Sequence, residues 1–341
     1  MKLSEIGEFG FIKRLSLPFV QNLPDGIVGI GDDCAVVQWR DETSLLVTTD
    51  MLIEGIHFLR AKISPRDLGY KSLAVNLSDI AAMGGTPMSA FISIGIPNEI
   101  EVEWLDDFYG GLHELAEAES VSLLGGDTTK SPADLVINLA VIGTEKSQLV
   151  KYRSTARPGD LICVTDFLGD SACGLRMLLE NMNLENDDSA FLVRRHNRPR
   201  AQLAEGAWLA AQSGVHAMMD VSDGIDSDLQ RIMDASCCGG HVQIERLPLS
   251  PQLQRISLQQ KWDAIEFAVA GGEDYCLLAT IDPARYRQIA DGFGKKFSRP
   301  LTTIGTILKN ERDLVYTENE KHYELHNHGF DHFAPHAKII G

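Results

Sequence analysis

Apolar positions along this chain recur with two different periods, and these periods predict its secondary structure. LVINLAVIGT at 135–144 and DLICVTDF at 160–167 are strand-like, whereas other segments repeat apolar residues every three to four positions, as one face of a helix does. We predict strands at residues 44–50, 90–96, 122–125, 135–144, 160–166, 216–221, 241–246, 274–281 and 302–308. Strands that alternate with helices indicate a mixed α/β protein.

Two helices can be placed from the signals at their ends. Ser64 is a good N-cap and Pro65 suits the first helical position, so one helix is predicted to begin there. Gly84 and Gly85 predict its end. A second amphipathic helix is expected from about Val102 to Glu119.

The chain is long for one hydrophobic core. Its 341 residues favour two domains. KYRSTARPGD, near residue 150, separates two strand-like runs and is the best boundary. We therefore predict an N-terminal domain at 1–150 and a C-terminal α/β domain at 151–341.

The net charge of −17 limits the possible partners. Nucleic acids and anionic membranes are poor partners, because the chain has no excess of basic residues. An anionic substrate would need a cation to mediate its binding. No apolar run approaches the roughly 18–20 residues of a spanning helix, and MKLSEIGEFGF has no signal-peptide core, so a cytoplasmic protein is expected. The six cysteines lack CxxC spacing, which favours buried free thiols over zinc or disulfides.

Five segments place aspartate beside glycine, serine or threonine, where apolar strands are predicted to end. One such Asp is more often a turn residue or a helix N-cap than a ligand. Five in one chain favour a shared site, because Mg²⁺ in proteins is held by carboxylate oxygens together with substrate phosphates. The segments are VGIGDDCAV (28–36), LLVTTDML (45–52), AVNLSDIAAMGG (74–85), SLLGGDTT (122–129) and AMMDVSDGIDSDL (217–229).

The common phosphate-binding motifs are absent from the sequence. There is no GxxxxGK[ST], no dinucleotide fingerprint and no protein-kinase motif set. DVSDGIDSD is not an EF-hand loop, because with Asp220 at position 1 the sixth position is Ile225, where glycine is required.

The motifs together resemble those of the thiamine-monophosphate kinase family. GIGDD and SDIAAMG occur more broadly, in relatives such as aminoimidazole ribonucleotide synthetase, selenophosphate synthetase and a hydrogenase-maturation protein. TTDMLIEGIHF and the late HGFDHF narrow the resemblance to the thiamine enzyme, and the match is collinear from about residue 4 to residue 335. It implies an N-terminal α/β domain that dimerises through its sheet, a C-terminal α/β domain, and ATP in the cleft between them.

The resemblance also implies roles for individual residues. For two of them a plain structural role is also open: Phe330 could be a core aromatic and His57 an ordinary polar residue. Tyr109 is implied to pack on the adenine. The implied Mg²⁺ ligands are Asp33, Thr48, Thr49, Asp50, Asp79, Asp127, Asp220 and Asp223. The implied ATP contacts are Tyr109, Gly126, Asp127, Arg153 and Ser222, and the implied thiamine-phosphate contacts are His57, Glu273 and Phe330.

The implied reaction converts ATP and thiamine monophosphate into ADP and thiamine diphosphate. Its nucleophile, a phosphate monoester, loses its second proton near pH 6, so no general base is needed. The obstacle is charge repulsion, about 4 kcal/mol for each pair of unit charges at 4 Å and an effective dielectric near 20, which bridging Mg²⁺ ions offset. We expect direct in-line transfer without a phosphorylated aspartate. The alternatives are a related ATP-dependent synthetase that activates an amide or carbonyl oxygen, and a non-catalytic module that binds Mg-nucleotide.

Overall fold

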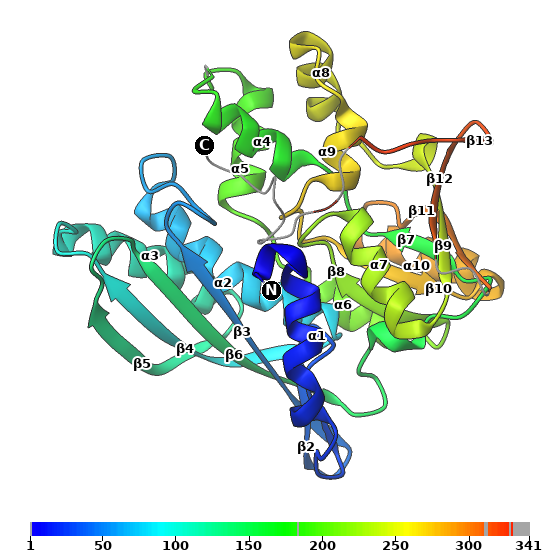
Figure 1. Cartoon of the computed structure of the whole chain (residues 1–341), viewed down its shortest axis with the longest axis horizontal. Helices are drawn as coiled ribbons and strands as arrows, with labels where there is room; N and C mark the ends of the chain where they lie inside the picture. The colour runs from blue at the N-terminus through cyan, green and yellow to red at the C-terminus, as the bar shows by residue number, and fades with distance from the viewer. Residues whose placement is uncertain (1, 183, 310–312, 327–328, 330–341) are drawn as a thin grey trace.

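The protein is an α/β molecule built around two β-sheets (Figure 1). The computed structural model describes residues 2–182, 184–309, 313–326 and 329. The two sheets lie side by side, and helix α2 (Pro65–Ala82) runs between them. The mixed α/β class predicted from the sequence is confirmed.

The first sheet has six strands in the order β1-β2-β3-β6-β4-β5. Neighbouring strands are antiparallel except β4 and β5, which are parallel. The helices of this region are α1 (Gly7–Val20), α2 and α3 (Val102–Ala118), with the short 3₁₀ turn η1 (Leu3–Glu5) before them. The strands are β1 (Ile27–Val28), β2 (Ala35–Arg40), β3 (Thr43–Ile53), β4 (Thr86–Ile96), β5 (Ser122–Lys130) and β6 (Val136–Lys146).

The second sheet has seven strands in the order β13-β12-β9-β11-β7-β10-β8. All its neighbours are antiparallel except β9 and β12. The strands are β7 (Leu161–Val164), β8 (Val215–Asp220), β9 (Gly239–Gln243), β10 (Leu277–Ile281), β11 (Thr302–Leu308), β12 (Leu314–Glu318) and β13 (Lys321–His322). The helices are α4 (Asp170–Leu179), α5 (Asp187–Asn197), α6 (Leu203–Ala210), α7 (Ile225–Ser236), α8 (Pro251–Gln260), α9 (Ala264–Ala270) and α10 (Pro283–Phe297), with 3₁₀ turns η2 (Arg153–Thr155) and η3 (Ile244–Arg246).

Helix α2 is covered on both sides, by the first sheet and by elements of the second region. The Ser64 hydroxyl accepts the backbone N–H of Asp67 at 3.0 Å, and Pro65 takes the first turn, as predicted. The helix ends at Ala82, followed by Gly84 with φ +78°. Against α6 the packing is so close that a Cβ on Gly206 would lie 2.2 Å from the Ala81 carbonyl oxygen. Consequently α2 packs closely against both regions.

The predicted strands are confirmed, with differences at their limits. β1, β2, β12 and β13 were not predicted, and β5 extends to Lys130. The strand expected at 274–281 begins only at Leu277, because Glu273 and Tyr275 have left-handed φ of +64° and +50°. Five of the six free cysteines are buried, but Cys237 is exposed, which corrects the expectation for that residue. Among the described residues, no helix is both long and apolar enough to cross a membrane.

The outer face of the first sheet, turned away from α2, keeps apolar side chains in solvent. Residues opposite each other on antiparallel strands share a face, so Thr49, Ala140 and Phe91 form one row of it. Phe91 and Met51 are exposed there, and edge strand β5 is exposed along its whole length.

Candidate active site

A cavity of about 1790 Å³ is lined by elements of both regions. This is larger than the roughly 300–1,000 Å³ of most small-ligand pockets, so it has room for two substrates. Its wall includes most of the residues predicted as functional from the sequence: Asp33, Thr48, Thr49, Asp50, His57, Asp79, Arg153, Asp220, Ser222, Asp223 and Glu273.

Three carboxylates converge at the centre of this site. Asp33 lies in the turn before β2, Asp79 in the last turns of α2, and Asp220 at the end of β8. Each offers a carboxylate oxygen, and these oxygens lie within 4.8 Å of one another. The donor set is that of a hard divalent cation such as Mg²⁺, so these residues fit the metal that the sequence implied.

The carboxylates destabilise one another's charge. Burial, followed by the repulsion of Asp50, Asp220 and Asp33, raises the pKa of Asp79 well above its ordinary value. Burial and Asp33 likewise raise the pKa of Asp220 to about 7. A bound cation would reverse this effect by stabilising the ionised forms.

Strand β3 presents its three predicted ligands on both faces. The Thr48 hydroxyl donates to Asp79 on the inner face, and the Asp50 backbone N–H donates to the Asn76 side chain at 3.1 Å. Burial and nearby acids raise the pKa of Asp50 to about 6. The Thr49 hydroxyl instead donates to the Leu139 carbonyl oxygen on the outer face, at 2.9 Å. Its side chain therefore points away from the three-carboxylate cluster.

The expectation that the acidic segments lie where strands end is met by only one of the five, at 217–229. Thr48–Asp50 lies inside β3 and Asp127 lies inside β5. Asp33 precedes β2 and Asp79 lies inside α2, whereas Asp220 is the last residue of β8 and Asp223 follows it. Asp50 therefore reaches the site from inside the long strand β3 and not from its end.

Two arginines approach the acids from the edge of the cluster. Arg153 reaches Asp33 at 2.5 Å, and its backbone N–H donates to Asp32 at 2.9 Å. Arg231 pairs with Asp223 and also with buried Asp228 at 3.0 Å. Asp223 thus contacts a guanidinium and lies apart from the three-carboxylate cluster in this structure.

His57, Ser222 and Glu273 form a different part of the cavity wall. The His57 Nδ1 accepts the Ile53 backbone N–H at 3.0 Å. Ser222 accepts the Glu273 backbone N–H at 2.7 Å, which joins the turn after β8 to the 271–275 segment. Although burial acts to raise it, the charge of Lys71 and hydrogen bonds from His196 and Lys71 hold the pKa of Glu273 well below its ordinary value.

Some predicted residues lie elsewhere. Tyr109 is on α3, packed edge-to-face against Phe108 with ring centroids 5.4 Å apart, and it does not line the cavity. Gly126 and Asp127 are exposed on edge strand β5, also outside the cavity lining. A Cβ on Gly126 would lie 1.6 Å from the Ile92 carbonyl oxygen, so only glycine fits there. Phe330 lies outside the described residues.

Sequence reasoning missed several residues that hold the site together. Asp32, next to Asp33, has its pKa raised to about 7, first by burial and then by Asp33. Ser78 donates to Asp220 at 2.6 Å across the two regions. Lys71 lies on α2 eight residues before Asp79 and is fully buried, and no motif in the sequence marked it.

Comparison with known proteins agrees with this arrangement. Residues 31–144 match the family described as AIR synthase related protein, N-terminal domain. A hydrogenase maturation protein, HypE in complex with ATP, has a TM-score of 0.67 at 18% identity, which shows a shared fold alone. The fold and its acidic cavity define a two-sheet α/β protein whose residues 31–144 form an AIR synthase-related N-terminal domain.

The sequence relatives narrow this class. The thiamine-monophosphate kinase of Salmonella typhimurium is 37% identical over 329 residues, covering 96% of this chain and 98% of that protein. The Bacillus subtilis (strain 168) enzyme of the same name is 34% identical over 309 residues, covering 90% and 93%. A solved structure described as AaThiL complexed with AMPPCP and TMP is 32% identical, covers 97% and 99% of the two chains, and gives a TM-score of 0.85. The chain belongs to the thiamine-monophosphate kinase family.

Proposed function

We propose that this protein transfers the γ-phosphoryl group of ATP to thiamine monophosphate and releases ADP and thiamine diphosphate. The observation behind it is the convergence of Asp33, Asp79 and Asp220 from three distant segments on a cavity large enough for two substrates. Family membership supplies the substrates, since relatives are named for this reaction and a similar chain was solved with AMPPCP and TMP.

Several Mg²⁺ ions are part of the proposal. Asp33, Asp79 and Asp220 would hold one, with Asp50, Asp223 and the Thr48 hydroxyl close by on the same wall. When bound, the ions neutralise phosphate charge and orient the reacting phosphates.

The chain's own residues bind and orient the substrates. The guanidinium of Arg153 lies at the edge of the cluster and is suited to donate two hydrogen bonds to a phosphate group. No side chain has to remove a proton, because the acceptor phosphate is already anionic near neutral pH. A phosphorylated aspartate is not part of the mechanism, since the same carboxylates are needed as metal ligands.

Product formation tests this function directly. The protein is incubated with ATP, Mg²⁺ and thiamine monophosphate, and thiamine diphosphate and ADP are separated by chromatography. Equal amounts of both products are expected. ADP release without thiamine diphosphate would indicate a synthetase or another acceptor, and the absence of either product would favour a non-catalytic Mg-nucleotide-binding module.

We further propose a homodimer formed through the first sheet. A fully exposed edge strand is a template for pairing with another chain, and the adjoining outer face presents Phe91 and Met51. In such a dimer Gly126 and Asp127, which are predicted phosphate contacts, would lie at the subunit interface.

Light scattering on Leu124→Lys tests the dimer, because Leu124 is 61% exposed on β5. A monomeric variant beside a dimeric wild type is expected. A monomeric wild type would contradict the proposal. The predicted domain limits at residues 150 and 151 and the cytoplasmic location also remain predictions.

A further inference from the structure

The side chain of Lys71 has no exposure to solvent, which is unusual for a charged residue. Its side chain is fully buried within α2. The ammonium donates to Glu273 Oε2 at 3.1 Å and lies 3.5 Å from His196 Nε2. A buried ammonium is costly unless it is paired, so this contact between the two regions must be well satisfied.

His196 completes the contact from α5. Its Nδ1 lies 3.0 Å from the same Glu273 Oε2 and 3.1 Å from the Ser171 hydroxyl. Burial, and then the charge of Lys71, lower the pKa of His196, so the ring is neutral at pH 7. Nδ1–H then donates to the carboxylate and Nε2 faces the ammonium. Both donors converge on one carboxylate oxygen, Oε2.

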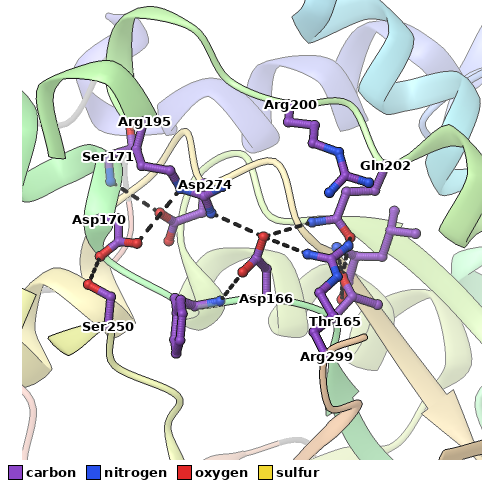
Figure 2. A network of polar contacts seen from close by, with 12 residues as sticks. Thr165, Asp166, Asp170, Ser171, Arg195, Arg200, Gln202, Ser250, Asp274 and Arg299 are labelled. Carbon is purple, nitrogen blue, oxygen red and sulfur yellow. Dashed lines mark hydrogen bonds and ion pairs between the residues drawn. The ribbon is translucent and has the colours of Figure 1, made fainter. Parts of the chain in front are cut away.

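The backbone at Glu273 is strained and is fixed from several sides. Left-handed φ at Glu273 and Tyr275, +64° and +50°, is unfavourable for residues with a side chain, and such strain persists where the surroundings determine the conformation. The Asp274 carboxylate between them accepts the backbone N–H of Gly169 at 2.6 Å. It also accepts that of Ser171 at 3.3 Å, a contact drawn in Figure 2. Successive side chains of this segment are therefore anchored to different elements.

This anchoring leaves one atom of Glu273 for a ligand. The side chain lines the cavity and is 25% exposed. Oε2 takes both donors, and among the described residues no hydrogen bond reaches Oε1. An ionised carboxylate suits a cationic ring or an exocyclic amine, and thiamine monophosphate has both.

We propose that Lys71 and His196 are positioning residues that hold Glu273 against the organic part of thiamine monophosphate. Lys71 and Asp79 lie eight residues apart on one rigid helix, about 12 Å along its axis. Helix α2 then fixes the distance between the Glu273 carboxylate and the acids beside the reacting phosphates. This inference rests on the proposed function.

The test is steady-state kinetics on Lys71→Met, which keeps the length of the side chain and removes its donor. The KM for thiamine monophosphate is expected to rise about tenfold or more, as for a lost charged hydrogen bond. The KM for ATP should stay within about twofold. A rise of both KM values together would overturn the proposal.

A double-mutant cycle separates positioning from a general structural role. If Lys71 acts through Glu273, Lys71→Met adds nothing once Glu273→Gln is present, and the double variant has the kcat/KM of Glu273→Gln alone. Additive losses would overturn the proposal. If Lys71→Met does not fold, His196→Leu makes the same test, since it removes the other donor to Oε2.

Arg198→Met is the matched control. Arg198 also links the end of α5 to α2, through Asp67 at 3.1 Å, and it does not line the cavity. Its kinetics should match the wild type even if its melting temperature falls. A KM rise equal to that of Lys71→Met would mean that any contact between the regions has this effect. A wild type that forms no thiamine diphosphate would instead refute the proposed function itself.

Discussion

Two groups of buried acids in this protein have the same residue types and different surroundings. The three-carboxylate cluster, Asp33, Asp79 and Asp220, lies in the cavity. A second group, the arginine-bound cluster, lies in the second-sheet region and contains Asp166, Asp170 and Asp274 with Arg195 and Arg299 (Figure 2).

In the arginine-bound cluster the chain supplies donors to each acid. Arg299 reaches Asp166 at 2.6 Å and buried Glu205 at 2.6 Å. The Ser250 hydroxyl donates to Asp170 at 2.5 Å. Figure 2 shows the guanidinium groups placed around these carboxylates from different elements. The arrangement joins α6, β7 and the segment before β11 without any ligand.

In the three-carboxylate cluster the charged groups that act on Asp79 are other acids. Asp50, Asp220 and Asp33 all raise the pKa of Asp79, and the opposing contribution there is one hydrogen bond from Thr48. Arg153 balances part of the charge from the edge. The comparison indicates that buried acids surrounded by donors from the chain serve the fold. Buried acids such as Asp79, whose charged neighbours are other acids, mark a place for an external cation.

The largest expected effect is that of Asp220→Asn on turnover. The amide keeps the size of the side chain but removes a charge that would hold metal, so kcat should fall by about 10²–10³ or more, as when a transition-state charge stabiliser is removed. Initial-rate assays at saturating ATP and Mg²⁺ measure this, with circular dichroism to establish the fold. Near-normal turnover would show that Asp220 does not hold the metal, and the two clusters would then not differ in function.

The second effect concerns stability and the other cluster. Arg299→Met should lower the free energy of unfolding by about 3–5 kcal/mol, because Glu205 and Asp166 would lose a buried partner. Urea denaturation measures this loss. The kcat/KM of the folded variant should equal that of the wild type, and a large kinetic defect would mean that the arginine-bound cluster also serves catalysis.

The acids of the three-carboxylate cluster could be singled out from the sequence, because each lies in a short local motif. The end signals of α2 and the alternation of β3 placed Asp79 and Asp50 on elements that do meet. Asp220 followed an apolar strand in the other half of the chain, and the clustering of acidic segments indicated that they shared a site.

The partners of those acids could not be predicted, because they depend on contacts between residues far apart in sequence. Nothing near Lys71 shows that it meets Glu273, 202 positions later. The opposite faces of Thr48 and Thr49 follow from the period of two in a strand, but only once β3 is known to include both. Conversely, Asp127 shares the motif pattern and lies on exposed β5 outside the cavity.

The smallest expected effect is a pH-dependent stabilisation by Mg²⁺. The pKa of Asp220 is raised from its ordinary value near 3.8 to about 7, and that of Asp50 to about 6. Between the ordinary pKa of these groups and their raised pKa, the native protein therefore binds more protons than the unfolded protein. Their contribution to stability is fully present below about pH 4 and is lost as the pH rises to about 7. Metal-free protein should thus lose stability over this interval from these two groups.

Mg²⁺ should recover this lost stability at pH values where the carboxylates are ionised, because protons compete with the metal for the same oxygens. A ligand at 100 times its dissociation constant stabilises the fold by about 2.7 kcal/mol, or several degrees in melting temperature. Thermal melts with and without Mg²⁺ should show a larger shift near pH 8 than near pH 5. Asp220→Asn should reduce the shift near pH 8, whereas Arg299→Met should keep it from a lower starting temperature. An equal shift at both pH values, or an equal loss of it in both variants, would mean that the two clusters do not differ in their need for a cation.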